Sequence, residues 1–168
     1  MNKKIRNYIL LVIIIFVSVC VMLLIGNVYK YVSNRKENKS YIVNKVQNYD
    51  FENIGKGING VKNNGLLYIT YIGNERIYNF EKESYKILKN NNLTSKFVYI
   101  DCTKNVNNGK VSSLNDKLNV ITDVDIVLPT IIYYKDGKPV DYIDSTNQVL
   151  TSDRFLQLIE KWELDVND

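Results

Sequence analysis

The sequence contains no histidine and no alanine, and only two of its 168 residues are cysteines. Without histidine the chain has no imidazole base, no histidine metal ligand and no imidazole pH switch. Two cysteines are too few for a four-thiolate zinc site or a disulfide framework. No other stretch has the spacing of a metal or cofactor motif. We therefore expect no metal site, no cofactor and no histidine-dependent catalysis.

The missing alanine is accompanied by an abundance of asparagine, isoleucine, lysine and tyrosine, with 13 tyrosines in the chain. These four residue types share codons that are rich in A and T. We interpret the bias as the signature of a low-GC bacterium, and not as a sign of a particular chemistry.

The net charge of +4 comes from 22 basic and 18 acidic residues, and it is concentrated at one end of the chain. Lys3, Lys4 and Arg6 stand far ahead of the first acidic residue, Glu37. Without those three, 19 basic residues face 18 acidic ones, which leaves a net charge of +1. A nucleic-acid-binding protein needs a basic stripe that can neutralise phosphates. The rest of the chain has none, so we expect no nucleic-acid partner.

An apolar run from Tyr8 to Tyr29 follows the basic residues. It holds roughly 20 uncharged residues, which as a helix span ~30 Å and match the hydrocarbon thickness of a bilayer. A cleaved signal peptide has a similar pattern, but no small-x-small cleavage site follows this run. A lipoprotein site at Cys20 is a further alternative, but the apolar run continues beyond that residue. We predict a single-pass helix that anchors the chain in the lipid bilayer of the cell membrane.

This anchor divides the chain into four parts. They are a cytoplasmic tail over residues 1–7, a transmembrane helix over 8–29, a polar juxtamembrane spacer over 30–47 and a folded domain over 48–168. Basic residues flank both ends of the helix, so the positive-inside rule hardly favours one orientation over the other. The short N-terminal tail most simply stays in the cytoplasm, which predicts an extracytoplasmic domain.

Hydrophobic patterning predicts alternating strands and helices in the domain. Short apolar runs predict strands at residues 66–72, 96–102 and 126–134, with an Asp-Gly turn leading to another at 139–143. Helical spacing predicts helices at residues 51–61, 75–89, 111–119 and 152–163. The order βαβαββα, with a helical or strand-helix segment in front, predicts an α/β fold with helices on both faces of a central mixed sheet.

The stretch from Val127 to Val140 (VLPTIIYYKDGKPV) resembles the C-terminal half of thioredoxin. There a cis-proline precedes an apolar strand, a Lys-Asp/Asn-Gly turn and the next strand. The resemblance implies a thioredoxin-like three-layer fold, in which Pro129 is cis and its turn helps to bind extended peptide. The alternative is an ordinary trans proline that starts an edge strand. The strand end Tyr71-Ile72-Gly73 is also similar to that of membrane-anchored thioredoxin-like proteins from low-GC bacteria, including bacteriocin-transport accessory proteins.

Thioredoxin chemistry depends on two cysteines one turn apart, at the start of the helix after the first central strand. The resemblance places these positions at Ile77 and Phe80, with Tyr78 and Asn79 between them. It places the buried acid that serves proton transfer near Tyr71. Neither Ile77 nor Phe80 can form a thiolate, and Tyr71 is no carboxylic acid. The resemblance therefore implies a redox-inactive domain and not an enzyme.

Cys102 is the one thiol outside the apolar run, and it ends a predicted buried strand. We interpret it as a core residue, because free cysteine is among the most buried residue types. The alternative is a thiol-disulfide enzyme that uses Cys102 through intermolecular disulfides. Two pairs of carboxylates, Asp123 with Asp125 and Asp141 with Asp144, lack a third ligand, and we interpret them as solvated loop charges.

The remaining candidate site is an apolar surface at the place where thioredoxins grip peptide. Its predicted members are Ile77, Tyr78, Asn79, Phe80, Leu128 and Pro129. Exposed aromatic and apolar groups of this kind suit contact with protein. The alternative is that Ile77 and Phe80 simply pack inward. We predict a membrane-anchored, redox-inactive domain that acts as an accessory or scaffold at the cell envelope by binding a protein or peptide.

Overall fold

A computed structural model describes residues 3–37, 39–106, 111, 114, 117 and 126–164. The chain divides into two compact units, residues 1–36 and residues 37–168. Most of the helix predicted at residues 111–119 lies outside the described residues, as do Asp123 and Asp125.

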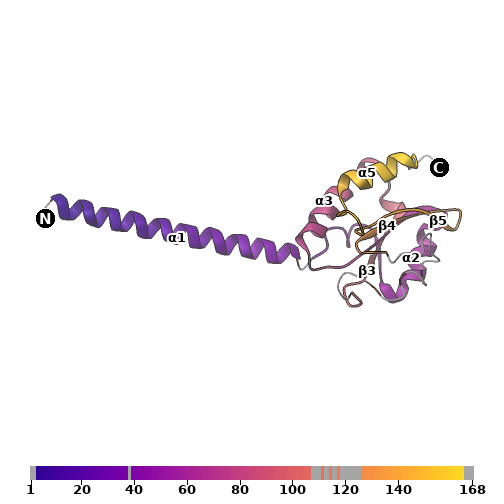
Figure 1. Ribbon diagram of the computed structural model, residues 1–168, viewed down its shortest axis with the longest axis horizontal. Helices are drawn as coiled ribbons and strands as arrows, with labels where there is room; N and C mark the ends of the chain where they lie inside the picture. Colours follow the sequence, from indigo (N-terminus) through magenta and orange to yellow (C-terminus); the bar gives the residue numbers. More distant parts are fainter. Residues whose placement is uncertain are drawn as a thin grey trace. The chain divides into compact units, whose positions relative to one another are not determined.

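The first unit is built on a single helix, α1 (Lys3–Glu37), which is labelled in Figure 1. Its stretch Ile5–Asn34 is long and apolar enough to cross a membrane. An apolar helix near the N-terminus meets the requirements of a transmembrane segment and also those of a signal sequence. The predicted span of residues 8–29 lies within this helix.

The second unit contains a five-stranded sheet in the order β1-β3-β2-β4-β5. The strands are β1 (Gln47–Asp50), β2 (Asn64–Thr70), β3 (Phe97–Asp101), β4 (Thr130–Lys135) and β5 (Lys138–Ile143). β3 pairs in parallel with β1 and β2, whereas β4 is antiparallel to β2 and β5. The predicted mixed sheet is therefore confirmed, and β2 lies at its centre.

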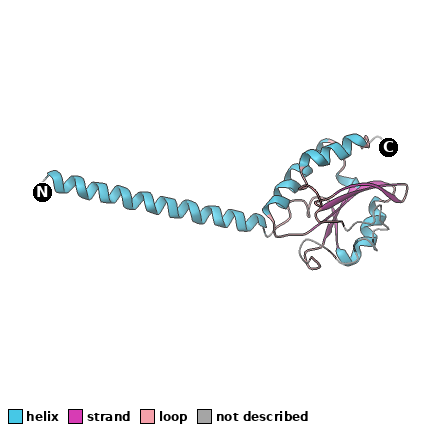
Figure 2. Cartoon of the chain, in the orientation of Figure 1, coloured by secondary structure: helices cyan, strands magenta, loops and turns pink. Residues whose placement is uncertain are grey.

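Helices cover both faces of this sheet (Figure 2). α2 (Ile54–Val61) lies on one face, and α3 (Glu75–Asn90) and α5 (Ser152–Lys161) lie on the other. Successive residues of a strand point to opposite faces, so a strand that is buried on both sides is apolar throughout. In β2, Leu66 and Tyr68 join the core under α3 and α5, while Leu67 and Ile69 join the core under α2. This three-layer α/β arrangement is the predicted fold class.

β1 is an edge strand that hydrophobic patterning does not reveal. Its four residues are polar or tyrosine and mostly exposed, and they are held by parallel backbone pairing with β3. Just ahead of β1, Ile42 is fully buried in the core under α3, although it falls within the polar stretch 30–47. The folded domain therefore includes residues on the N-terminal side of β1.

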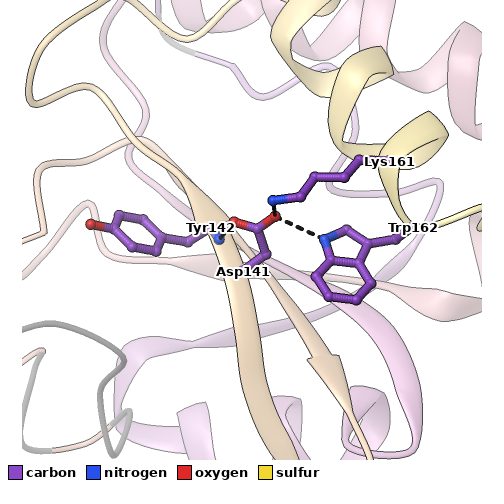
Figure 3. A network of polar contacts seen from close by, with 4 residues as sticks. All are labelled: Asp141, Tyr142, Lys161 and Trp162. Carbon is purple, nitrogen blue, oxygen red and sulfur yellow. Dashed lines mark hydrogen bonds and ion pairs between the residues drawn. The ribbon is translucent and has the colours of Figure 1, made fainter.

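A polar network fastens the C-terminal end of α5 to β5 (Figure 3). The Oδ2 atom of Asp141 accepts hydrogen bonds from Lys161 Nζ (2.6 Å) and from Trp162 Nε1 (2.8 Å). Burial acts to raise the pKa of Asp141, but the hydrogen bonds from Lys161 and Trp162 outweigh it and hold that pKa below its usual value. The interpretation of Asp141 as a solvated loop charge is therefore wrong, because it lies on a strand that packs against α5.

Candidate functional site

Three segments of the domain surround a cavity of about 170 Å³: the start of α3, the turn before β4, and the loop between β5 and α5. Its lining consists of Tyr71, Asn74, Arg76, Ile77, Phe80, Leu128, Pro129, Ser145, Val149 and Leu150. Pockets for drug-sized ligands measure ~300–1,000 Å³. This smaller cavity suits a single side chain of a larger partner.

The first wall of the cavity is the start of α3. The side chain of Asn74 caps the helix by accepting a hydrogen bond from the backbone N–H of Arg76 (2.8 Å). In the first turns Ile77 and Phe80 are only 6% and 7% exposed, and the Phe80 ring packs against Tyr68 on β2. Ile77 and Phe80, which the resemblance places at the positions of the thioredoxin cysteines, thus pack largely inward while still forming part of the cavity wall.

The second wall is the turn that leads into β4. The peptide bond between Leu128 and Pro129 is cis, as the resemblance to thioredoxin implies. Leu128 is buried, and Thr130 at the start of β4 donates a side-chain hydrogen bond to the carbonyl oxygen of Ile143 on β5 (3.1 Å). The predicted cis-proline turn is confirmed, and it contributes to the same cavity as the start of α3.

The third wall is the loop between β5 and α5. The buried carboxylate of Asp144 accepts a hydrogen bond from the backbone N–H of Val127 (3.3 Å). Ser145 donates its backbone N–H to the Val127 carbonyl and its hydroxyl to the Pro129 carbonyl, both at 3.2 Å. From α5, Arg154 Nη1 donates to the Asp144 carbonyl at 2.8 Å. Asp144 is therefore a structural group that joins the loop to the proline turn, and the prediction of a solvated charge is wrong.

The cavity brings together four of the six predicted site residues, namely Ile77, Phe80, Leu128 and Pro129. Asn79 is exposed and is not part of the lining. Tyr78 also stays outside it, and its ring packs edge-on against Tyr41 with 5.6 Å between the ring centroids.

Sequence reasoning missed the lining residues that come from the loop after β5, and it missed Arg76 at the start of α3. Ser145, Val149 and Leu150 belong to a polar, irregular stretch with no local motif. The signal that could have found them is the order of the elements, because a strand that returns beside β4 must deliver its following loop next to the proline turn.

The lining combines apolar residues with one positively charged side chain. Among the described lining residues Arg76 is the only charged one, and its side chain is exposed. It stands in the first turn of α3, where the helix dipole adds partial positive charge and the neighbouring Glu75, which is outside the lining, offsets part of it. The lining contains no thiol and no carboxylate, and the described residues contain no group of three metal-ligating side chains. This arrangement suits the binding of a neutral or acidic group.

Cys102 does not belong to this cavity. Its side chain is 0% exposed and packs in the core under α2. Burial, with a further contribution from the neighbouring Asp101 carboxylate, raises the pKa of the Cys102 thiol to about 12. Because the thiolate is the reactive form, a thiol with this pKa stays protonated and weakly nucleophilic at neutral pH. The alternative of a thiol enzyme therefore gains no support from the position of its sulfur.

No family model matches the sequence, and no curated protein matches it. Solved structures do match it. Thioredoxin f2 from Chlamydomonas reinhardtii is 13% identical with a TM-score of 0.50, and the alignment covers 70% of this chain and 96% of that chain. Thioredoxin from Trypanosoma brucei brucei is 18% identical with a TM-score of 0.49, over 71% of this chain and 91% of that chain. At such identities the likeness concerns the fold alone, and this chain contains a domain with a thioredoxin-like fold.

Proposed function

We propose that this chain is a membrane-anchored, redox-inactive thioredoxin-like protein that binds a protein or peptide partner at the cell envelope. The observation that carries the proposal is the cavity between α3, the cis-proline turn and the loop after β5. Ile77 and Phe80 line it together with Leu128 and Pro129. The domain thus keeps the proline turn of the fold and presents apolar groups where a dithiol would act.

The chemistry of the lining narrows the kind of partner. The cavity accepts about one apolar side chain, and Val149 at its edge is 57% exposed. Arg76 and the start of α3 place positive charge beside it. A partner segment that inserts an apolar side chain and carries an acidic group next to it is complementary to both features. We therefore propose an acidic-apolar protein or peptide segment as the occupant.

Redox inactivity is supported by the residues at the start of α3 and by the buried state of Cys102. The full-length protein in detergent should not accelerate the reduction of insulin by dithiothreitol, and the Cys102→Ser variant should behave like the wild type. Catalysed reduction that disappears in Cys102→Ser would instead establish the thiol enzyme.

We further propose that α1 remains attached and anchors an extracytoplasmic domain. The apolar stretch Ile5–Asn34 supports the anchor. The mass of the protein isolated from membranes distinguishes an anchor from a cleaved signal. Protease treatment of intact cells should degrade the domain, whereas a cytoplasmic domain would be cut only after the cells are opened.

Photo-crosslinking tests whether the cavity binds a partner. A photoreactive amino acid placed at Val149, inside the lining, should capture a discrete protein in native membranes. The same group at Leu156 is the matched control, because that side chain is 36% exposed on α5 but lies outside the lining. Equal capture at both positions, or capture of lipid alone at Val149, would count against the proposal.

A partner could also be bound through the anchor, as in an interaction module of a membrane complex. Replacing α1 by an unrelated transmembrane helix separates the two possibilities. The cavity proposal predicts that the partner captured from Val149 is still captured after this replacement.

A further inference from the structure

Helix α3 carries a buried carboxyl group that the cavity does not use. Glu81 is 1% exposed and does not line the cavity. Burial of a carboxylate is costly, and an apolar residue of similar volume is often at least as stable at such a position. The presence of an ionisable group in this part of the core therefore has a cost that ordinary packing does not explain.

Glu81 holds the chain segment that leads from the end of α1 to β1. Its Oε2 atom accepts hydrogen bonds from the Ser40 hydroxyl (2.7 Å) and from the backbone N–H of Tyr41 (2.6 Å). The Ser40 hydroxyl oxygen in turn accepts from the N–H groups of Ile42 and Val43, both at 3.2 Å. One carboxyl group therefore fixes the conformation of four consecutive residues.

Aromatic rings close over this contact from the outside. Tyr41 packs edge-on against Tyr78 and Tyr85 of α3, with ring centroids 5.6 and 6.1 Å apart. Lys45 Nζ lies 3.1 Å from the centroid of the Tyr41 ring. All three tyrosines are half-buried, so this cover is one layer thick. A displacement of residues 40–45 would admit water directly to Glu81.

Among the described residues, no cation compensates the charge of Glu81 on its inner side. Its Oε1 atom is buried and has no hydrogen-bond partner among the described residues. The ionisable groups that act on it from the sheet are Tyr68 on β2 and Tyr99 and Asp101 on β3. Burial raises the pKa of both tyrosines, so they stay neutral, and Asp101 can only repel a second carboxylate. α5 contributes apolar residues to this core.

We propose that Glu81 is a proton-controlled latch, which when protonated holds residues 40–46 against the domain and when ionised favours the release of that segment. Burial, opposed in part by the hydrogen bonds from Ser40 and Tyr41, raises the pKa of Glu81 to about 7 from an ordinary value of 4.5. Between pH 4.5 and about 7, Glu81 therefore keeps its proton while residues 40–46 are held against the domain (the closed form) and loses it when they are released (the open form). A rise in pH between these two values therefore shifts the equilibrium towards opening.

The latch has a mechanical consequence that does not depend on what occupies the cavity. Residues 40–46 lie between the end of α1 and the start of β1. When released and extended, these residues span up to about 23 Å. Opening would therefore free this connecting segment to extend, and the pH around the domain would set the fraction of molecules in which it is free.

Hydrogen exchange of the full-length protein in detergent tests the latch. The readout is the protection factor of the 41–43 amides between pH 5.5 and pH 8, after correction for the intrinsic exchange rate at each pH. In the wild type, protection should fall by roughly 10- to 30-fold over this range, as the two pKa values require. In Glu81→Gln, which keeps an acceptor but cannot ionise, protection should be independent of pH. Glu83→Gln is the matched control, because Glu83 is on the same helix, exposed, and paired with Lys86.

Protection that is independent of pH in the wild type, or equally dependent on pH in Glu81→Gln, would overturn the proposal. The amides of β2 report whether a variant is folded. If Glu81→Gln does not fold, Ser40→Ala supplies the second test, because it removes one donor and leaves Glu81 in place. Ser40→Ala should lower the protection of residues 41–43 at every pH and keep the pH dependence. Protection equal to that of the wild type would contradict the latch.

Discussion

Arg154 Nη1 lies 2.8 Å from the carbonyl oxygen of Asp144, and this hydrogen bond ties α5 to the loop that closes the cavity. The same nitrogen donates to the carbonyl oxygen of Gln148 at 2.9 Å. Asp144 in turn accepts a hydrogen bond from Val127, beside the proline turn. Arg154 therefore shapes the cavity although it does not line it.

The Arg154→Met substitution should loosen this loop. Methionine keeps an apolar stem but cannot donate, and the loss of hydrogen bonds from a charged donor should cost about 1–3 kcal/mol of unfolding free energy. Hydrogen exchange of residues 145–150 should accelerate, and crosslinking from Val149 should fall. Glu160→Met on the same helix serves as the control, because Glu160 is exposed and does not line the cavity. Exchange that is unchanged in Arg154→Met would contradict the positioning role.

Gly65 lies where β2 passes close to its neighbours. A Cβ atom at this position would stand 2.8 Å from the Lys96 carbonyl oxygen and 2.9 Å from Val61 Cβ. Because one of these contacts is with backbone, Gly65→Ala should lower the unfolding free energy by about 1–3 kcal/mol. Gly55→Ala on α2 has nothing within 4 Å and should stabilise by up to about 1 kcal/mol. Chemical denaturation of both variants measures the difference, and equal stabilities would contradict the packing around Gly65.

Trp162 is the only tryptophan in the chain, and it reports on the network in Figure 3. Because the pKa of Asp141 lies below its usual value of 3.8, the stabilising contribution of its charge is present above that value and is lost as pH falls through the lowered pKa. Trp162 fluorescence should therefore change at a pH below the ordinary carboxyl range. In Asp141→Asn this transition should be absent, and the unfolding free energy should fall by about 1 kcal/mol. The same acid transition in both proteins would disprove that the titration of Asp141 causes the change in fluorescence.

Glu81 should make the unfolding free energy depend on pH in the opposite direction to Asp141. Because its pKa is raised, Glu81 makes its full contribution to the unfolding free energy below pH 4.5. That contribution is lost as the pH rises to about 7. The total corresponds to about 3 kcal/mol. The difference in unfolding free energy between the wild type and Glu81→Gln should change by this amount between pH 4.5 and pH 7.5. A constant difference would show that Glu81 titrates normally.

The main elements of the fold follow from the sequence because buried strands and amphipathic helices carry strong periodic signals. The inner residues of β2, β3 and β4 are apolar or aromatic, and Asp136-Gly137 forms the expected turn with positive φ at both residues. β1 escapes prediction because its polar residues are fixed by backbone pairing with β3. Ile42 escapes it because the run Tyr41–Val43 is too short to show a periodicity within a mostly polar stretch.

The cavity could be predicted only in part. Ile77, Phe80, Leu128 and Pro129 were accessible through the resemblance to thioredoxin, because the proline turn marks the position opposite the start of α3. Ser145 and Val149 were not accessible, because irregular loops are placed by tertiary hydrogen bonds such as that between Arg154 and Asp144. The role of Glu81 was hidden for a similar reason, since its partners Ser40 and Tyr41 lie about 40 residues away in the sequence.

Crosslinking from Val149 in an Arg76→Glu background tests most directly whether the cavity binds an acidic-apolar segment. Arg76 is exposed, so reversing its charge should leave the fold intact while it repels the proposed partner. Arg76→Lys, which keeps the charge, serves as the control. We predict that capture of the partner falls at least about tenfold in Arg76→Glu, equivalent to about 1.4 kcal/mol of binding free energy, and is retained in Arg76→Lys. Undiminished capture in Arg76→Glu would contradict the proposed binding mode.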